Sequence, residues 1–151
     1  MTNYISKGIF DMVVISAKWD VHEVKKLQET IVKIETEGGA KVVILGPMLP
    51  YSMPLPRLLT RASMSQIEKE QTMRLPHVRL LDDALREQTM AVHGHYISLL
   101  DILCNKHICK TKLGVSTPLL WDKSHFTEEG ALFMVSKIEP LLKSSFNSGV
   151  N

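Results

Sequence analysis

An aspartate and a histidine, Asp122 and His125, lie three residues apart near the C-terminal end of the chain. The short polar segment that holds them leads into an amphipathic stretch typical of a helix, so both side chains can face one pocket. Histidine titrates near neutral pH, and a neighbouring carboxylate can fix its tautomer and stabilise its protonated form, as in serine hydrolases. The two residues are therefore a candidate acid–base pair. For this spacing alone, an aspartate that caps a turn beside a packed histidine is the more common interpretation.

A base of this kind needs a nucleophile, and no serine in the sequence has the expected surroundings. Ser16 follows an apolar segment typical of a strand, but the next residues do not form the tight, glycine-flanked turn of a serine nucleophile. Ser52 fits the role less well, and Ser124 is explained more simply as a turn hydroxyl. Because losing a triad's serine lowers the rate by several orders of magnitude, a triad mechanism needs a serine from outside this sequence.

Four segments predict the fold class. Residues 11–16 and 41–45 are short, apolar and rich in β-branched side chains, as expected for parallel strands buried on both faces. Residues 21–37 carry an apolar stripe at helical spacing and end at two glycines, which predicts a strand, helix, strand unit. Residues 96–101 are a third strand candidate. We therefore expect an α/β protein, a three-layer sandwich around a parallel sheet of about three to five strands, flavodoxin-like in type.

The remaining segments predict loops and helices around this sheet. Residues 48–61 contain closely spaced prolines and turn formers, which predict a loop. This loop follows the C-terminal end of a strand, where open α/β sheets place their ligands. Helices are expected over residues 65–74, 77–92 and 127–143, the last with Thr127 as its N-cap.

The composition is that of a soluble globular protein. Of the 151 residues, 44% are apolar and 23% are charged, and the net charge is +2 without a basic run, so we expect no nucleic-acid partner. No apolar stretch approaches the ~20 residues of a membrane span, and the N-terminal segment does not resemble a signal peptide. We expect one domain over residues 1–143 and a flexible tail over residues 144–151.

The two cysteines, Cys104 and Cys109, lie five residues apart. A local disulfide in an oxidising compartment and two reduced thiols in the cytosol fit this spacing about equally well. A zinc site that includes His107 is a weaker alternative, because the usual Cys-x-x-Cys pair is absent. The two histidines of residues 93–95 are better explained as part of a turn that ends a helix. We therefore expect no metal ion.

Residues 122–131 read Asp-Lys-Ser-His-Phe-Thr-Glu-Glu-Gly-Ala, an Asp-x-x-His followed by an apolar residue, a hydroxyl residue and a Gly-Ala pair. Together with residues 13–19, 42–47 and 96–101 and the cysteine pair, this block resembles a known family. It is similar to the SGNH domain at the C-terminus of membrane-bound O-acyltransferases (acyltransferase family 3), a branch of the SGNH or GDSL-like hydrolases. The resemblance covers about residues 10–143.

The resemblance implies an acyltransferase or esterase that acts on acyl esters of surface carbohydrate. Asp122 and His125 would be the acid and base of a Ser-His-Asp triad, and Cys104 and Cys109 would form a disulfide on the extracytoplasmic, periplasmic side. The chemistry would need no cofactor, and the domain would be tethered to a membrane acyltransferase. Without a signal peptide, the chain would be cytoplasmic if expressed as it is.

The N-terminal part departs from the family pattern. The family's Gly-Asp-Ser block and its oxyanion-hole glycine precede the segment that residues 12–16 match, so we expect a domain that lacks the first strand block. The SGNH pattern also has an asparagine in a Gly-x-Asn-Asp block, which should fall near residues 16–20 and is missing here. The acyltransferase-linked branch carries a tryptophan at this place, which matches Trp19. The candidates for the pocket or the oxyanion side are Ser16, Trp19, Gly46 and Trp121.

Two hypotheses follow from this comparison with the family. The first is an O-acyltransferase or esterase domain that is inactive until a serine is supplied from elsewhere. The second is a non-catalytic remnant or a carbohydrate-binding module. In either case, the strand at residues 12–16 would have one free edge. We expect the chain to form a homodimer through this edge, to add a strand from elsewhere, or to be only marginally stable.

Overall fold

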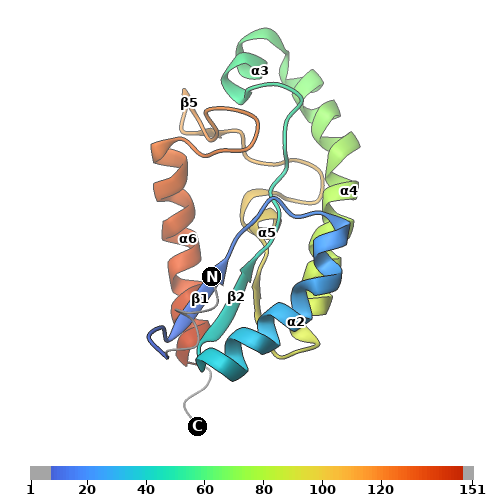
Figure 1. Cartoon of the computed structure of the whole chain (residues 1–151). Helices are drawn as coiled ribbons and strands as arrows, with labels where there is room; N and C mark the ends of the chain where they lie inside the picture. Colours follow the sequence, from blue (N-terminus) through green and yellow to red (C-terminus); the bar gives the residue numbers. More distant parts are fainter. Residues whose placement is uncertain (1–7, 148–151) are drawn as a thin grey trace. The chain divides into compact units, whose positions relative to one another are not determined.

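The computed structural model describes residues 8–147 (Figure 1). The chain divides into two compact units. The first, which we call the sheet unit, comprises Met1–Pro47, Leu80–Ser98 and Pro140–Asn151. The second, which we call the motif unit because it contains Asp122 and His125, comprises Met48–Arg79 and Leu99–Glu139.

The sheet unit is formed around three parallel strands, in the order β1 (Met12–Ile15), β2 (Lys41–Leu45) and β3 (His95–Ile97). The helix α2 (Val21–Gly38) connects β1 to β2 (Figure 1). Val42, Val43 and Ile44 are all fully buried. Because successive side chains of a strand point to opposite faces, both faces of β2 are covered. The predicted α/β class with a parallel sheet is confirmed.

The core of the sheet unit lies between this sheet and two helices. The helix α2 contributes an apolar stripe, and α4 (Met64–Met90) contributes Leu85. The buried members of this core are Val24, Leu27, Ile31, Ile34, Ala40, Val42, Ile44 and Leu85. After α2, Gly39 has a φ of 66°, and its N–H donates to the carbonyl oxygen of Glu35 at 3.0 Å. This left-handed turn explains why a glycine ends the helix.

The helix α4 is continuous, although the sequence predicted two helices that separate near Pro76. That prediction is wrong. A proline inside a helix removes one backbone hydrogen bond, here to the carbonyl oxygen of Thr72. Pro76 and Thr72 are both exposed, so water can reach this carbonyl and the loss is tolerated. The helix therefore continues through the proline with one backbone hydrogen bond fewer.

The strand predicted over residues 96–101 is correct only as far as Ile97. The chain then forms a short helix, α5 (Leu99–Leu103), in the motif unit. Its buried residues are Leu99, Leu100 and Leu103, a spacing that places them on one helical face. A short apolar run does not distinguish a strand from a buried helix, which explains the error.

The motif unit also contains α3 (Leu55–Arg61), so the loop predicted over residues 48–61 is wrong for its second half. Proline is compatible with the first turn of a helix, where its missing N–H has no partner to lose. A small antiparallel hairpin consists of β4 (Lys112–Leu113) and β5 (Thr117–Pro118). The last helix, α6 (Glu128–Asn147), begins where the sequence predicted it. It continues beyond the predicted end at residue 143, so the first residues of the expected tail are helical. Residues 148–151 of that tail lie outside the described residues.

The strand β1 has a neighbour on one side only, within residues 8–147. Its residue Val14 is 42% exposed, and Ile9 and Phe10 just before the strand are also exposed. An unpaired strand edge carries free N–H and C=O groups that can pair with another chain. Homodimerisation through this edge stays a prediction.

Candidate active site

The segment from Leu120 to Phe126 forms a closed loop in the motif unit. An isolated antiparallel bridge joins Leu120 to Phe126, and the N–H of Trp121 donates to the carbonyl oxygen of His125 at 3.0 Å. The indole of Trp121 is largely exposed, and its ring centroid lies 6.1 Å from that of His125. The loop therefore brings Trp121, Asp122 and His125 together.

Asp122 and His125 are joined directly by their side chains. Oδ2 of Asp122 lies 2.6 Å from Nδ1 of His125. Oδ1 of Asp122 accepts hydrogen bonds from the N–H groups of Ser124, at 2.8 Å, and His125, at 2.7 Å. An ionised carboxylate only accepts, so Nδ1 carries the proton and Nε2 is left as the basic nitrogen. This is the arrangement that a general base of a Ser-His-Asp triad requires.

These hydrogen bonds lower the pKa of Asp122 to about 2, from an ordinary value of 3.8. The largest cause is the backbone N–H of Ser124, followed by the backbone N–H and then the side chain of His125. All three donors favour the charged carboxylate. Asp122 is therefore ionised at neutral pH and can stabilise a protonated His125.

The lowered pKa of Asp122 predicts a pH-dependent contribution to stability. A carboxylate whose pKa is lower in the folded state contributes stability that is fully present above its unfolded pKa and is lost as the pH falls through the folded pKa. The free energy of unfolding of the wild type should therefore exceed that of Asp122→Asn at pH 5, by a margin that shrinks between about pH 4 and pH 2. Denaturant titrations at several pH values measure this margin. A margin that stays constant down to pH 2 would contradict the assigned hydrogen bonds.

The start of α6 fixes the loop from its C-terminal side. The Oγ1 of Thr127 accepts a hydrogen bond from the N–H of Gly130 at 3.0 Å, as an N-cap residue does, and donates to the carbonyl oxygen of Pro118 at 2.9 Å. Gly130 is buried against the main chain: a Cβ atom there would lie 2.2 Å from the carbonyl oxygen of Leu119. Only glycine fits this position without a shift of the backbone.

The sheet unit holds the other predicted candidates. Ser16 is exposed after β1. Trp19 is partly buried, packs against the core of the sheet unit and donates from Nε1 to the carbonyl oxygen of Leu45 at 2.7 Å. Gly46 is buried, and its N–H already donates to the carbonyl oxygen of Ile97 at 2.9 Å. These contacts give Trp19 and Gly46 structural roles, and an oxyanion role for Gly46 would require this bond to break.

Gly46 also leaves room for a hydrogen-bonded pair of side chains. A Cβ atom at Gly46 would lie 2.2 Å from the hydroxyl oxygen of Tyr96 and 2.5 Å from Oδ1 of Asp82. Tyr96 donates its hydroxyl to that carboxylate at 2.7 Å, and Ser98 donates to the other oxygen at the same distance. The glycine thus permits a polar network at the end of β2.

Comparison with known protein families decides where the chain belongs. The family model described as "SGNH domain (fused to AT3 domains)" matches residues 2–140. The chain belongs to this family of SGNH domains. The predicted resemblance is therefore confirmed over nearly the whole sequence. No curated protein sequence matches the chain significantly.

A solved structure supports the same fold for this SGNH domain. The periplasmic domain of a lipopolysaccharide acetyltransferase from Salmonella ser. Paratyphi A matches with a TM-score of 0.70 and 21% sequence identity. The match covers 88% of this chain and 57% of that structure, so the chain spans little more than half the length of its neighbour. The SGNH-type α/β fold is thereby confirmed. Among the residues that the structure describes, no helix is both long and apolar enough to cross a membrane.

The SGNH domain has a disulfide between Cys104 and Cys109, with an S–S distance of 2.06 Å. Of the three interpretations of this cysteine pair, which were a disulfide, two reduced thiols and a zinc site, the structure shows the disulfide. The bridge closes a loop in which the N–H of Asn105 donates to the carbonyl oxygen of Ile108 at 2.9 Å. In the described residues, 8–147, no group of three or more His, Cys, Asp or Glu side chains could hold a metal ion.

Reduction of this disulfide should lower the stability of the domain. A cross-link that closes so short a loop contributes roughly 2 kcal/mol to the free energy of unfolding, so the melting temperature should fall by about 4–8 °C. Thermal unfolding with and without a thiol reductant measures the change. The double variant Cys104→Ala/Cys109→Ala is the control, because its melting temperature should not respond to the reductant. A melting temperature that responds to a chelator instead would favour zinc over the disulfide.

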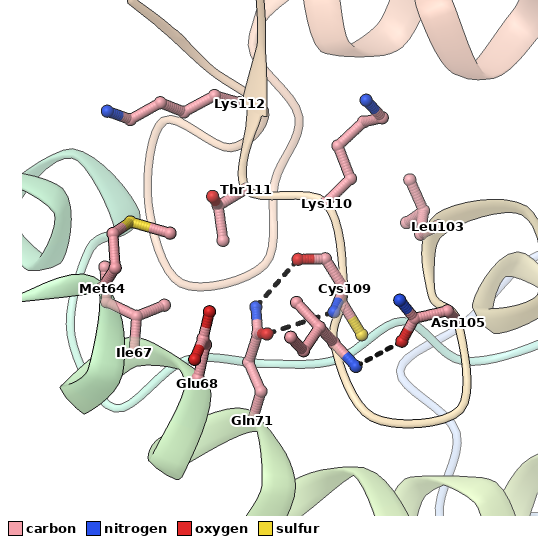
Figure 2. A pocket seen from close by; sticks show the side chains of 11 residues that line it. Met64, Ile67, Glu68, Gln71, Leu103, Asn105, Cys109, Lys110, Thr111 and Lys112 are labelled. Carbon is pink, nitrogen blue, oxygen red and sulfur yellow. Dashed lines mark hydrogen bonds between the residues drawn. The ribbon is translucent and has the colours of Figure 1, made fainter.

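A pocket of about 450 Å³ lies beside the disulfide in the motif unit (Figure 2). Ile67 and Leu103 provide apolar walls, and Glu68, Lys110 and Lys112 provide charged groups. None of the lining residues belongs to the loop of residues 120–126. The pocket is therefore not the site formed by Asp122 and His125.

Two residues that support the site were not singled out from the sequence. Tyr51 lies in the proline-rich segment, and its N–H donates to the carbonyl oxygen of Lys123 at 3.0 Å. Gln71, on α4, donates from Nε2 to the hydroxyl oxygen of Tyr51 at 2.8 Å. The position of residues 48–61 after a strand indicated that this segment, which includes Tyr51, lies near a binding site. No local pattern in the sequence marks Gln71.

Proposed function

We propose that this SGNH domain provides the acid and base of a Ser-His-Asp triad that transfers or hydrolyses acyl esters of surface carbohydrate. The observation that carries the proposal is the 2.6 Å contact between Oδ2 of Asp122 and Nδ1 of His125. It leaves Nε2 of His125 as the basic nitrogen, in a side chain that is 71% exposed and accessible to a partner. The nucleophilic serine would come from sequence outside these 151 residues.

The chemistry would proceed through an acyl-serine intermediate. The serine oxygen attacks the carbonyl carbon of the acyl donor, and the hydroxyl proton moves to Nε2 of His125. The C–O bond of the donor then breaks, and the leaving oxygen takes that proton. In the second half, Nε2 of His125 removes a proton from the acceptor hydroxyl, whose oxygen attacks the acyl carbon. The bond between the acyl carbon and the serine oxygen then breaks, and the serine oxygen takes the proton from His125. A sugar hydroxyl as acceptor gives acyl transfer, and water gives hydrolysis.

The charge of Asp122 supports the step in which His125 becomes protonated. The pKa of Asp122 is lowered to about 2, so its carboxylate stays ionised next to the imidazolium. The disulfide supports an oxidising, extracytoplasmic place of action. The family is named for its fusion to AT3 (acyltransferase family 3) domains. Such a fusion would supply the tether of this domain to the membrane.

The second candidate is a non-catalytic module with the same fold. It is favoured by one observation: among the described residues of the motif unit, Asp122 is the only side chain hydrogen-bonded to the imidazole of His125. In this case the paired Asp122 and His125 would stabilise the loop or bind a carbohydrate hydroxyl, without an acyl intermediate.

Hydrolysis of an activated acetate ester separates the two candidates. The 151-residue chain should be inactive, whereas the polypeptide in which this domain is joined to its AT3 domain should hydrolyse the ester at a rate that depends on His125. A His125-dependent rate in the isolated chain would contradict the external serine. Inactivity of both proteins, with both folded by circular dichroism, would favour the non-catalytic module.

A further inference from the structure

The side chain of Gln71 is fully buried in the motif unit, and its amide makes three hydrogen bonds to two other segments. Its Oε1 accepts from the N–H of Cys109 at 3.1 Å, and its Nε2 donates to the carbonyl oxygen of Cys109 at 3.0 Å. Figure 2 shows both bonds beside the disulfide loop. The same Nε2 donates to the hydroxyl oxygen of Tyr51 at 2.8 Å. Because a buried amide is costly unless paired, these three bonds fix the relative positions of all three residues.

Tyr51 connects this network to the main chain of the acid–base loop. The side chain of Tyr51 is buried, which raises the pKa of its phenol. Its N–H donates to the carbonyl oxygen of Lys123 at 3.0 Å, and the N–H of Leu55 donates to the carbonyl oxygen of Asp122 at 2.9 Å. Residues 51–55 therefore hold the backbone immediately before the amides of Ser124 and His125.

We propose that Gln71 and Tyr51 are positioning residues for the Asp122 and His125 pair. Their hydrogen bonds form a continuous path from the backbone of Cys109, through the amide of Gln71 and through Tyr51, to the carbonyl of Lys123. They act through the backbone of the loop, because the hydrogen bonds of the Gln71 amide go to Tyr51 and Cys109, and the bond from Tyr51 to the loop is made by its main-chain N–H. The effect of this positioning on catalysis rests on the proposed function. The structural coupling of Gln71 and Tyr51 to the loop of residues 120–126 does not.

Small displacements of such a pair matter for catalysis. A misplacement of 1 Å in a catalytic group can lower a rate by about 100-fold, so the surroundings of the pair must hold it tightly. Four hydrogen bonds close the loop of residues 120–126 on itself, and Trp121 and His125 are largely exposed. The bonds from Tyr51 and Leu55 tie this loop to another segment of the motif unit.

Amide hydrogen exchange in the 151-residue chain tests this coupling. The variant Tyr51→Phe removes one hydroxyl, and Gln71→Met removes the whole amide at similar volume. In both folded variants, the N–H groups of Ser124 and His125 should exchange about 10-fold faster relative to the amides of β2. The control Thr89→Val removes another buried hydrogen bond on α4, from Thr89 Oγ1 to the carbonyl oxygen of Leu85, and should leave these two amides unchanged.

Two results would overturn the proposal. Unchanged exchange at Ser124 and His125 would show that the path does not hold the loop. An equal acceleration at all amides would show a structural role in the domain as a whole, without specific positioning. If Gln71→Met does not fold, Tyr51→Phe alone decides. A complete lack of acyl transfer would count against the proposed function and would leave the exchange result as it stands.

Discussion

Replacing His125 with alanine should lower the rate of acyl transfer by roughly four to six orders of magnitude in the polypeptide that also contains the serine. The imidazole is the only group in the pair that can take a proton from a hydroxyl near neutral pH, because Asp122, with a pKa of about 2, is already ionised and far too weak a base. In the His125→Ala variant, the carboxylate of Asp122 therefore cannot replace the imidazole as the general base. Initial rates with an acetyl donor and a saccharide acceptor measure the effect.

The control for this variant is His77→Ala, which removes an exposed histidine from α4. It should keep the wild-type rate, so that a loss specific to His125 cannot be assigned to the removal of any histidine. Circular dichroism of the two variants should agree closely, and the melting temperature of His125→Ala should be lower only by the loss of its side-chain hydrogen bond to Asp122. A His125→Ala protein that retains more than about one-tenth of the wild-type rate would contradict a triad mechanism.

Replacing Gly130 with alanine should destabilise the domain by about 2 kcal/mol, although alanine is the better helix former. Two effects oppose each other. Alanine gains up to about 1 kcal/mol from helix propensity, but its Cβ would lie 2.2 Å from the carbonyl oxygen of Leu119. This carbonyl accepts from the N–H of Thr127 at 3.1 Å, so it cannot move away without losing that bond. The steric cost therefore exceeds the propensity gain.

The matched control is Ala131→Gly, at the next position of α6. Ala131 is exposed, so this change acts through backbone entropy and should cost about 1 kcal/mol or less. Denaturant titrations of both variants give the comparison. A Gly130→Ala variant as stable as the wild type would contradict the claim that the close contact between α6 and the carbonyl oxygen of Leu119 requires a glycine.

The sequence predicted those parts of the fold in which a local pattern decides the structure. The continuous apolar segments at residues 12–15 and 41–45 are parallel strands, as predicted. The expected burial on both faces is found for β2, whereas β1 is only partly covered and its Val14 is exposed. The segment of residues 96–101 was only partly correct, since a short apolar run fits a strand and a helix equally well. The helices predicted over residues 65–74 and 77–92 form one helix that continues through Pro76, because the exposure of this proline to solvent is a tertiary property that no local pattern shows.

The candidate site divides in the same way. The spacing of Asp122 and His125 was enough to predict that their side chains can meet, because three residues within one tight loop bring them together. Gln71 and Tyr51 were missed, since their role depends on bonds to Cys109 and Lys123, which are distant in sequence. The role of Gly130 also depends on a tertiary contact, although the Gly-Ala pair itself was part of the family resemblance.

The central claim is that Asp122 and His125 serve a serine from outside these 151 residues. Labelling with a serine-directed phosphonate, followed by mass spectrometry of the digested protein, tests it most directly in a longer polypeptide that carries this domain together with an AT3 domain. We predict one labelled serine outside the 151 residues, and loss of that label in His125→Ala. A labelled serine within the 151 residues, or a label that persists without His125, would contradict the account.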